Sequence, residues 1–182
     1  VGVPERAQRV LLGDTRLAYA RLTAHLRDRD AGPATIVTAG DPGFFGVLRE
    51  LRDSGFEVVA YPTTTSVALA FGRVGMPWDD AVVLAVTDEA SLARAANVAR
   101  AHPKVAVVSV PEIGPHKIAA ALREAQRSFV VAQHLGEPDE LIEHTTPAEA
   151  ASRIDWSDSS TVLILDRERL GEPDSPRGPR WG

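Results

Sequence analysis

Continuous apolar runs alternate with stretches of helical periodicity along most of the chain. Runs of strand length, rich in Val and Ile, are Ala34–Thr38, Phe56–Tyr61, Ala81–Val86, Val105–Val110, Phe129–Ala132 and Thr161–Leu165. Between them, apolar residues have amphipathic helical spacing over Phe44–Asp53, Ser66–Arg73, Glu89–Ala101 and Pro115–Gln126. This alternation predicts an α/β fold with a largely parallel sheet.

Local chemistry marks several boundaries. Asp88 is expected to cap the helix that begins near Glu89, and Gly55 to close the helix that ends near Ser54. The break at Gly75–Trp78 places a lobe boundary between Pro77 and Glu89. We therefore expect an N-terminal α/β lobe over residues 1–80, a C-terminal α/β lobe over 81–170, and a Gly/Pro-rich tail or linker over 171–182.

Composition excludes several classes of protein. The chain has 182 residues, 44% of them hydrophobic, a net charge of −5 and no cysteine, which excludes disulfides, thiolate metal sites and a cysteine nucleophile. No basic run points to nucleic-acid binding, and no apolar run approaches the ~20 residues that span a bilayer. We expect a cytoplasmic protein that contacts neither nucleic acid nor membrane.

The segment Thr38–Gly46 has the most specific local pattern, with three glycines, Pro42 and Asp41 between an expected strand and helix. Ligands of open α/β sheets bind beyond the carboxyl ends of strands. Asp41 could accept hydrogen bonds from the amine or hydroxyl of a small molecule, or it could simply cap the helix. The loop lacks the Lys-Ser/Thr of a P-loop and the glycine spacing of a dinucleotide site, which favours a neutral or zwitterionic ligand.

Three further turns gather polar groups, at Pro62–Ser66, Pro111–Pro115 and Gln133–Glu140. Capping alone explains two of the four consecutive hydroxyls in the first turn. The histidines form no H-x-x-x-H pair and there is no cysteine, so no metal site is expected. There is also no G-x-S-x-G elbow, and no catalytic residue can be assigned.

The chain resembles the tetrapyrrole methylases. The likeness rests on Gly40-Asp41-Pro42-Gly43-Phe44-Phe45-Gly46, on Thr65–Ala70 after Pro62, and on Arg73–Asp80. The Gly-Met-Pro-Trp-Asp-Asp stretch and Leu135–Glu140 are similar to the precorrin C5-methyltransferases of cobalamin biosynthesis, the enzymes of precorrin-6Y and precorrin-7. The resemblance covers about Ala34–Asp166.

This resemblance implies a two-lobed α/β fold with mostly parallel sheets, a cofactor cleft between the lobes, and a homodimer. The cofactor would be S-adenosylmethionine, with S-adenosylhomocysteine as product, and the substrate a precorrin methylated at C5. Because that substrate carries many carboxylates, Arg16, Arg73 and Lys117 are expected to attract it. The cofactor-binding residues that the resemblance implies are Gly40, Asp41, Pro42, Phe45, Thr65, Ser66, Ile113 and Gly114.

Two alternatives remain open. One is a methylase of the same superfamily with another substrate, such as a different tetrapyrrole position, diphthine or ribosomal RNA. The other is a non-catalytic cofactor-binding or dimerisation lobe, because Thr87-Asp88 stands where the family has a Ser-x-His-Gly-Arg stretch and only Val1–Val3 could be left of the first strand. The tail resembles a linker to a fused C15-methyltransferase/decarboxylase domain.

Overall fold

A computed structural model describes residues 15–28, 30–38, 40–45, 47–157, 160–166 and 168. Val1–Val3, Gly46, the tail from Gly171 and the side chain of Arg16 lie outside the described residues. The chain divides into two units, Val1–Ala39 and Gly40–Gly182. The lobe boundary predicted after residue 80 stays a prediction.

The first unit contains helix α1 (Thr15–Arg27), which the apolar periodicity did not predict. Its apolar stripe is weak, since Leu17 and Leu26 are each 50% exposed, although Ala18 is buried. An extended segment follows the helix, and its Gly32 carbonyl accepts a hydrogen bond from His25 Nε2 at 2.7 Å.

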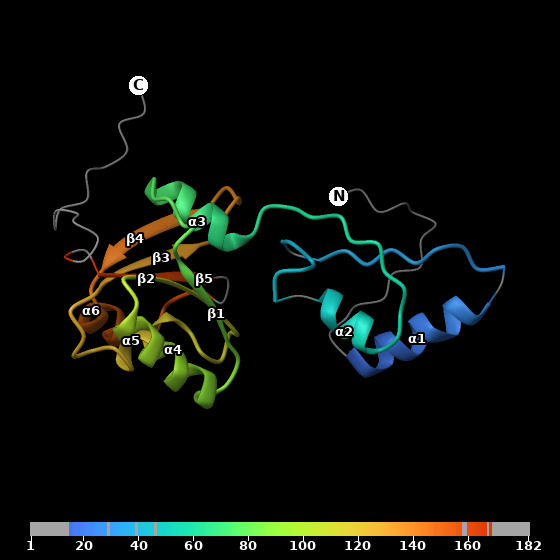
Figure 1. The fold of residues 1–182 in the computed structure, drawn as a ribbon, viewed down its shortest axis with the longest axis horizontal. Helices are drawn as coiled ribbons and strands as arrows, with labels where there is room; N and C mark the ends of the chain where they lie inside the picture. The colour runs from blue at the N-terminus through green and yellow to red at the C-terminus, as the bar shows by residue number, and fades with distance from the viewer. Residues whose placement is uncertain are drawn as a thin grey trace, which may run out of the picture. The chain divides into compact units, whose positions relative to one another are not determined.

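The second unit contains a five-stranded sheet in the order β1-β2-β5-β3-β4 (Figure 1). The strands are β1 (Val82–Val86), β2 (Lys104–Ser109), β3 (Ser128–Gln133), β4 (Leu141–Thr145) and β5 (Ser160–Leu165). Its helices are α2 (Val47–Asp53), α3 (Ser66–Val74), α4 (Glu89–Ala101), α5 (Pro115–Ala120) and α6 (Pro147–Ser152).

Helices cover both faces of this sheet. Along β2, Val105 and Val107 belong to a core cluster with residues of α4, α5 and α6, whereas Ala106 between them belongs to a second cluster with α3. Successive strand residues point to opposite faces, so α3 covers one face, and α4, α5 and α6 cover the other. This two-sided burial explains why the strands are continuous apolar runs.

The prediction of a mostly parallel sheet is wrong for the described residues. Only β1 and β2 pair in parallel, while β5 runs antiparallel to both β2 and β3, and β3 antiparallel to β4. A continuous apolar run indicates burial on both faces, and it does not determine strand direction. Direction here follows from the connections, since a short turn joins β3 to β4 and β5 inserts between β2 and β3.

Two predicted buried strands, Ala34–Thr38 and Phe56–Tyr61, are also wrong. Neither segment forms a strand within the described ranges, and Val37 and Tyr61 are 56% and 83% exposed. A strand requires a neighbour for its backbone hydrogen bonds, and the described residues provide none for these two segments.

The other element predictions differ mainly at their ends. Helix α4 has the predicted bounds, and the Asp88 cap is confirmed by its carboxylate, which accepts from Ser91 N at 2.7 Å. Gly55 has φ +84° and donates to the Arg52 carbonyl, which confirms its predicted role in closing α2. Helix α5 ends at Ala120 and not at the predicted Gln126. Beyond it the chain forms tighter turns, in which, for example, Leu122 N donates to Ala119 O. The short elements β4 and α6 were not predicted.

No helix in the described part of the chain is long and apolar enough to cross a membrane.

Candidate active site

Asp41 joins two loops of the second unit. Its Oδ1 accepts a hydrogen bond from Gly43 N at 2.7 Å, and its Oδ2 accepts one from Thr63 N at 3.0 Å. The interpretation of Asp41 as a simple helix cap is therefore wrong, since α2 begins only at Val47 and the carboxylate is bonded elsewhere. The bond to Thr63 spans 22 positions and connects the Gly-Asp-Pro loop to the loop before α3.

The two glycines beside Asp41 are needed for different reasons. Gly40 has φ +72°, a left-handed conformation that residues with a side chain rarely adopt. Gly43 has ordinary φ, but a Cβ there would lie 3.1 Å from Asp41 Oδ1. A side chain at Gly43 would therefore require the Asp41 carboxylate to shift by a few tenths of an ångström.

The adjacent residues Phe44 and Phe45 differ in burial, since Phe44 anchors the loop to the core and Phe45 is exposed. Phe44 packs against the core cluster beneath α3, and its ring contacts that of Phe45 edge-on with centroids 4.8 Å apart. Phe45 is 56% exposed and has φ +48°, a rare backbone conformation for an aromatic residue. The loop thus presents an apolar ring to solvent next to Asp41 and the exposed backbone of Gly40.

The loop before α3 presents hydroxyl groups. Thr65 caps α3, with its Oγ1 accepting from Ala68 N at 3.1 Å, as the capping interpretation predicted. Thr63 and Thr64 are exposed, whereas Thr65 and Ser66 are half-buried. Asp41 therefore brings the predicted residues Gly40, Asp41 and Pro42 next to the hydroxyl-rich segment that contains Thr65 and Ser66.

The third predicted segment lies after β2. Ile113 is 4% exposed and belongs to the core, so its side chain is not available to a ligand. Gly114 precedes α5 and lines a cavity of about 90 Å³. The bonds between Asp41 and its partners do not extend to this turn, and its place in the same site stays a prediction.

One of the residues that line this cavity has a buried polar atom without a partner. His116 Nδ1 is buried and makes no hydrogen bond among the described residues. A Cβ on Gly114 would lie 3.1 Å from this nitrogen, so the imidazole packs directly on the glycine. Buried polar groups are generally satisfied, which makes this atom a candidate to bind a ligand group or water. The cavity is lined by Ser109, Val110, Pro111, Gly114, Pro115, His116, Ile154, Trp156, Ser157 and Ser160.

The sequence gives no signal for the side of this cavity formed by Trp156, Ser157 and Ser160. No motif marks these residues, because they meet the turn after β2 only through the antiparallel pairing of β2 with β5. Trp156 is 8% exposed, and its Nε1 donates to the Ala150 carbonyl at 3.2 Å.

Two of the cations expected to attract substrate are already paired. Arg73 forms a two-pronged ion pair with Glu140, and this hydrogen bonding raises the pKa of Arg73 and lowers that of Glu140. Lys117 Nζ lies 3.8 Å from Glu89 Oε1. A carboxylate-rich ligand would compete with Glu140 and Glu89 for these cations.

Comparisons with known proteins cover both sequence and structure. The profile of the tetrapyrrole (corrin/porphyrin) methylases matches residues 4–151. A comparison with curated protein sequences finds no significant match. Solved structures with the same fold are numerous, and three of the most similar are methyltransferases.

The uroporphyrin-III C-methyltransferase from Thermus thermophilus, solved with S-adenosylhomocysteine, is 21% identical over 91% of this chain and 80% of its own, with a TM-score of 0.63. The methyltransferase CobJ is 21% identical over 91% and 78%, with a TM-score of 0.64. The precorrin-6Y methylase CbiE from Archaeoglobus fulgidus is 18% identical over 90% and 74%, with a TM-score of 0.60. Because the sequence identities are this low, the structures establish the fold alone.

The family profile covers most of the chain and includes the Gly-Asp-Pro loop, the hydroxyl-rich loop and the turn at Gly114. The α/β fold and the family predicted from the sequence motifs are thereby confirmed. The chain belongs to the tetrapyrrole (corrin/porphyrin) methylases, a family of S-adenosylmethionine-dependent methyltransferases.

Proposed function

We propose that this protein transfers a methyl group from S-adenosylmethionine to a carbon of a precorrin macrocycle, at C5, in cobalamin biosynthesis. Family membership supports the reaction class. The C5 assignment is supported by the Gly-Met-Pro-Trp-Asp-Asp and Leu-Gly-Glu-Pro-Asp-Glu stretches. The fold is shared with methylases of other tetrapyrrole substrates, so it does not by itself select the position.

The observation that carries this proposal is the pair of hydrogen bonds made by Asp41. They hold the Gly-Asp-Pro loop against the loop of Thr63–Ser66, which presents hydroxyl groups. A zwitterionic amino-acid group needs acceptors for its ammonium and donors for its carboxylate. Each Asp41 oxygen makes one bond to a backbone N–H and keeps a lone pair for an ammonium, while Thr63 and Thr64 expose donors. The residues present therefore fit the methionine end of the cofactor.

When bound, the cofactor would supply an electrophilic methyl group on its sulfonium, and a nucleophilic macrocycle carbon would bond to this methyl as the carbon–sulfur bond breaks and its electron pair stays on sulfur. The protein's contribution is alignment, because this displacement needs the two reacting atoms in line and close. Gly40 and Pro42 shape the loop, Asp41 holds it, and Phe45 offers an exposed ring that can exclude water. A displacement of this kind requires no catalytic triad.

The cavity at Gly114 fits the proposal as the place for another polar part of the ligand. His116 Nδ1 has no partner in the described structure, and Ser109, Ser157 and Ser160 line the same space. We assign Ile113 a backbone contact only, since its side chain lies in the core.

Calorimetry with S-adenosylhomocysteine tests the cofactor site. Asp41→Ala removes the acceptor of two backbone N–H groups, and hydrogen bonds to a charged group contribute about 1.5–3 kcal/mol, so affinity should fall about 10- to 100-fold. The matched control Asp53→Asn changes an exposed carboxylate at the end of α2 and should bind like the unchanged protein. Equal affinity in Asp41→Ala and the unchanged protein would contradict the assignment.

The substrate is tested by incubation with isotope-labelled S-adenosylmethionine and a series of precorrins. NMR of the product should place the label on C5. Transfer to another macrocycle carbon, to diphthine or to ribosomal RNA would select the alternative methylases. Cofactor binding without transfer to any of them would favour the non-catalytic lobe, which the Thr87-Asp88 substitution motivates.

We also propose a homodimer, which sedimentation equilibrium would test. The fused C15-methyltransferase/decarboxylase domain stays a prediction from the resemblance.

A further inference from the structure

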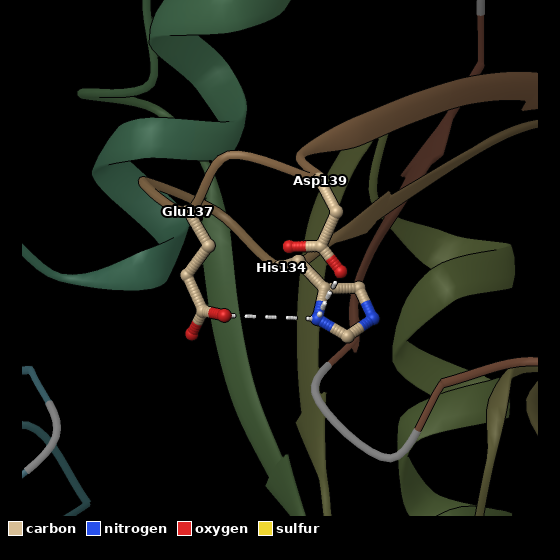
Figure 2. A group of neighbouring side chains, drawn as sticks. All are labelled: His134, Glu137 and Asp139. Atoms are coloured by element: carbon tan, nitrogen blue, oxygen red, sulfur yellow. Dashed lines mark ion pairs between the residues drawn. The ribbon is translucent and has the colours of Figure 1, made fainter.

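The connection between β3 and β4 brings an imidazole and two carboxylates together (Figure 2). His134 Nδ1 lies 3.4 Å from Asp139 Oδ2 and 3.9 Å from Glu137 Oε2. All three donor atoms lie within 4.8 Å of one another. Figure 2 shows the carboxylates of Glu137 and Asp139 both directed toward the imidazole of His134.

The charges of these residues are unbalanced. Among the described residues, the ion pairs of Glu137 and Asp139 are with His134 and with no lysine or arginine. The neighbouring Arg73 is occupied by both oxygens of Glu140. Two carboxylates thus face one imidazole, and the turn can accept a cation.

Groups other than the three donor side chains hold this turn in shape. Glu140 Oε2 accepts from Gly136 N at 2.7 Å, and the same carboxylate is paired with Arg73 of α3. The backbone closes through bonds from Glu137 N to His134 O at 2.9 Å and from Glu140 N to Glu137 O at 3.1 Å. The donors are therefore brought together by a braced hairpin, and an ion would not have to order the turn on binding.

The donor set selects the class of ion. One imidazole nitrogen with two carboxylate oxygens suits a borderline first-row metal such as Zn²⁺, whereas Mg²⁺ and Ca²⁺ prefer all-oxygen sites. A tetrahedral Zn²⁺ with bonds of about 2.0–2.1 Å separates its ligands by about 3.3 Å. The His134–Asp139 distance of 3.4 Å meets this value, whereas Glu137 Oε2, at 3.9 Å from the nitrogen and within 4.8 Å of the Asp139 oxygen, must shift to complete the set.

We propose that His134, Glu137 and Asp139 form a binding site for a divalent transition metal, with Zn²⁺ the best-suited ion. Their side chains are 33%, 64% and 66% exposed, so the ion would keep water or an outside ligand in its remaining positions. The three donors are not among the residues proposed to bind the cofactor, and the proposal does not depend on methyl transfer.

Calorimetric titration of the full chain with ZnCl₂ tests the proposal. His134→Asn removes the imidazole and suits the position, because φ at His134 is +50° and asparagine tolerates the left-handed region. We expect one Zn²⁺ per chain, and at least about tenfold weaker binding in His134→Asn and in Asp139→Asn. Mg²⁺ should bind more weakly than Zn²⁺.

Two variants outside the turn serve as controls. His102→Ala and Glu124→Gln remove an exposed imidazole and an exposed carboxylate elsewhere in the second unit, and both should bind Zn²⁺ like the unchanged protein. Circular dichroism checks that each variant folds. Glu137→Gln provides a third variant of a donor residue, and it too should bind Zn²⁺ more weakly. No Zn²⁺ binding by the unchanged chain, or equal loss in the controls and the turn variants, would overturn the proposal.

Discussion

Replacing Arg127 by methionine should destabilise the second unit severely. Arg127 Nε donates to Ala99 O at 2.9 Å, and its two terminal nitrogens donate to Gln126 O and Arg100 O at 2.8 Å each. One of them also pairs with Asp166 Oδ2 at 2.9 Å. Ala99 and Arg100 lie in the last turn of α4, whose carbonyls have no partner within the helix.

The expected loss of stability follows from the burial of the ion pair between Arg127 and Asp166. The side chains of Arg127 and Asp166 are only 10% and 11% exposed. Removing one partner of a buried ion pair leaves the other charge uncompensated and costs about 3–5 kcal/mol. For a chain of this size each kcal/mol lowers Tm by about 2–4 °C, so Arg127→Met should lower it by about 6–20 °C.

Guanidinium denaturation and calorimetry measure this loss. Arg127→Lys keeps the charge, but a lysine has no planar group that reaches three carbonyls. The stability of this variant should lie between that of the methionine variant and that of the unchanged protein. Arg123→Met is the matched control, because Arg123 is exposed, and it should change stability by no more than about 0.5 kcal/mol. A loss below about 1 kcal/mol in Arg127→Met would refute the reasoning.

Two further measurements test the core and the pH dependence. Phe71→Ala empties a position of 0% exposure and should cost about 3–5 kcal/mol in chemical denaturation, whereas Tyr61→Ala, at 83% exposure, should cost little. Hydrogen bonds from Ser91, Arg73 and Thr146 lower the pKa of Asp88, Glu140 and Glu149 respectively. Because these folded-state pKa values lie below the unfolded ones, the stabilisation is present at neutral pH and is lost as pH falls below about 4.5 through the folded values. Tm should therefore drop on acidification, and a drop as steep in Glu149→Gln as in the unchanged protein would contradict a contribution from that residue.

Short-range patterns predicted the elements whose hydrogen bonds close within a few residues. Helix α4 has the predicted bounds because its cap, Asp88 with Ser91, spans three positions. The closing glycine of α2 and the threonine cap of α3 are local in the same sense. The family motifs are also contiguous along the chain, so they indicate the tetrapyrrole methylases without any knowledge of long-range contacts.

The predictions that were wrong concern pairing between distant segments. Apolar runs at Ala34–Thr38 and Phe56–Tyr61 have the composition of strands, yet a strand forms only with a partner, and the described residues contain none for them. The insertion of β5 between β2 and β3 makes most of the sheet antiparallel, and no local pattern in the apolar runs encodes it.

The sequence by itself determined the family, the helix caps and the loop that carries Asp41. Only the tertiary structure showed that Asp41 binds the backbone of Thr63, that His116 faces residues from before β5, and that His134 meets Glu137 and Asp139. The physical reason is that caps and turns are satisfied by neighbours along the chain, whereas sites form where the sheet brings strand ends together. That placement depends on the order and direction of strands, which are long-range properties of the fold.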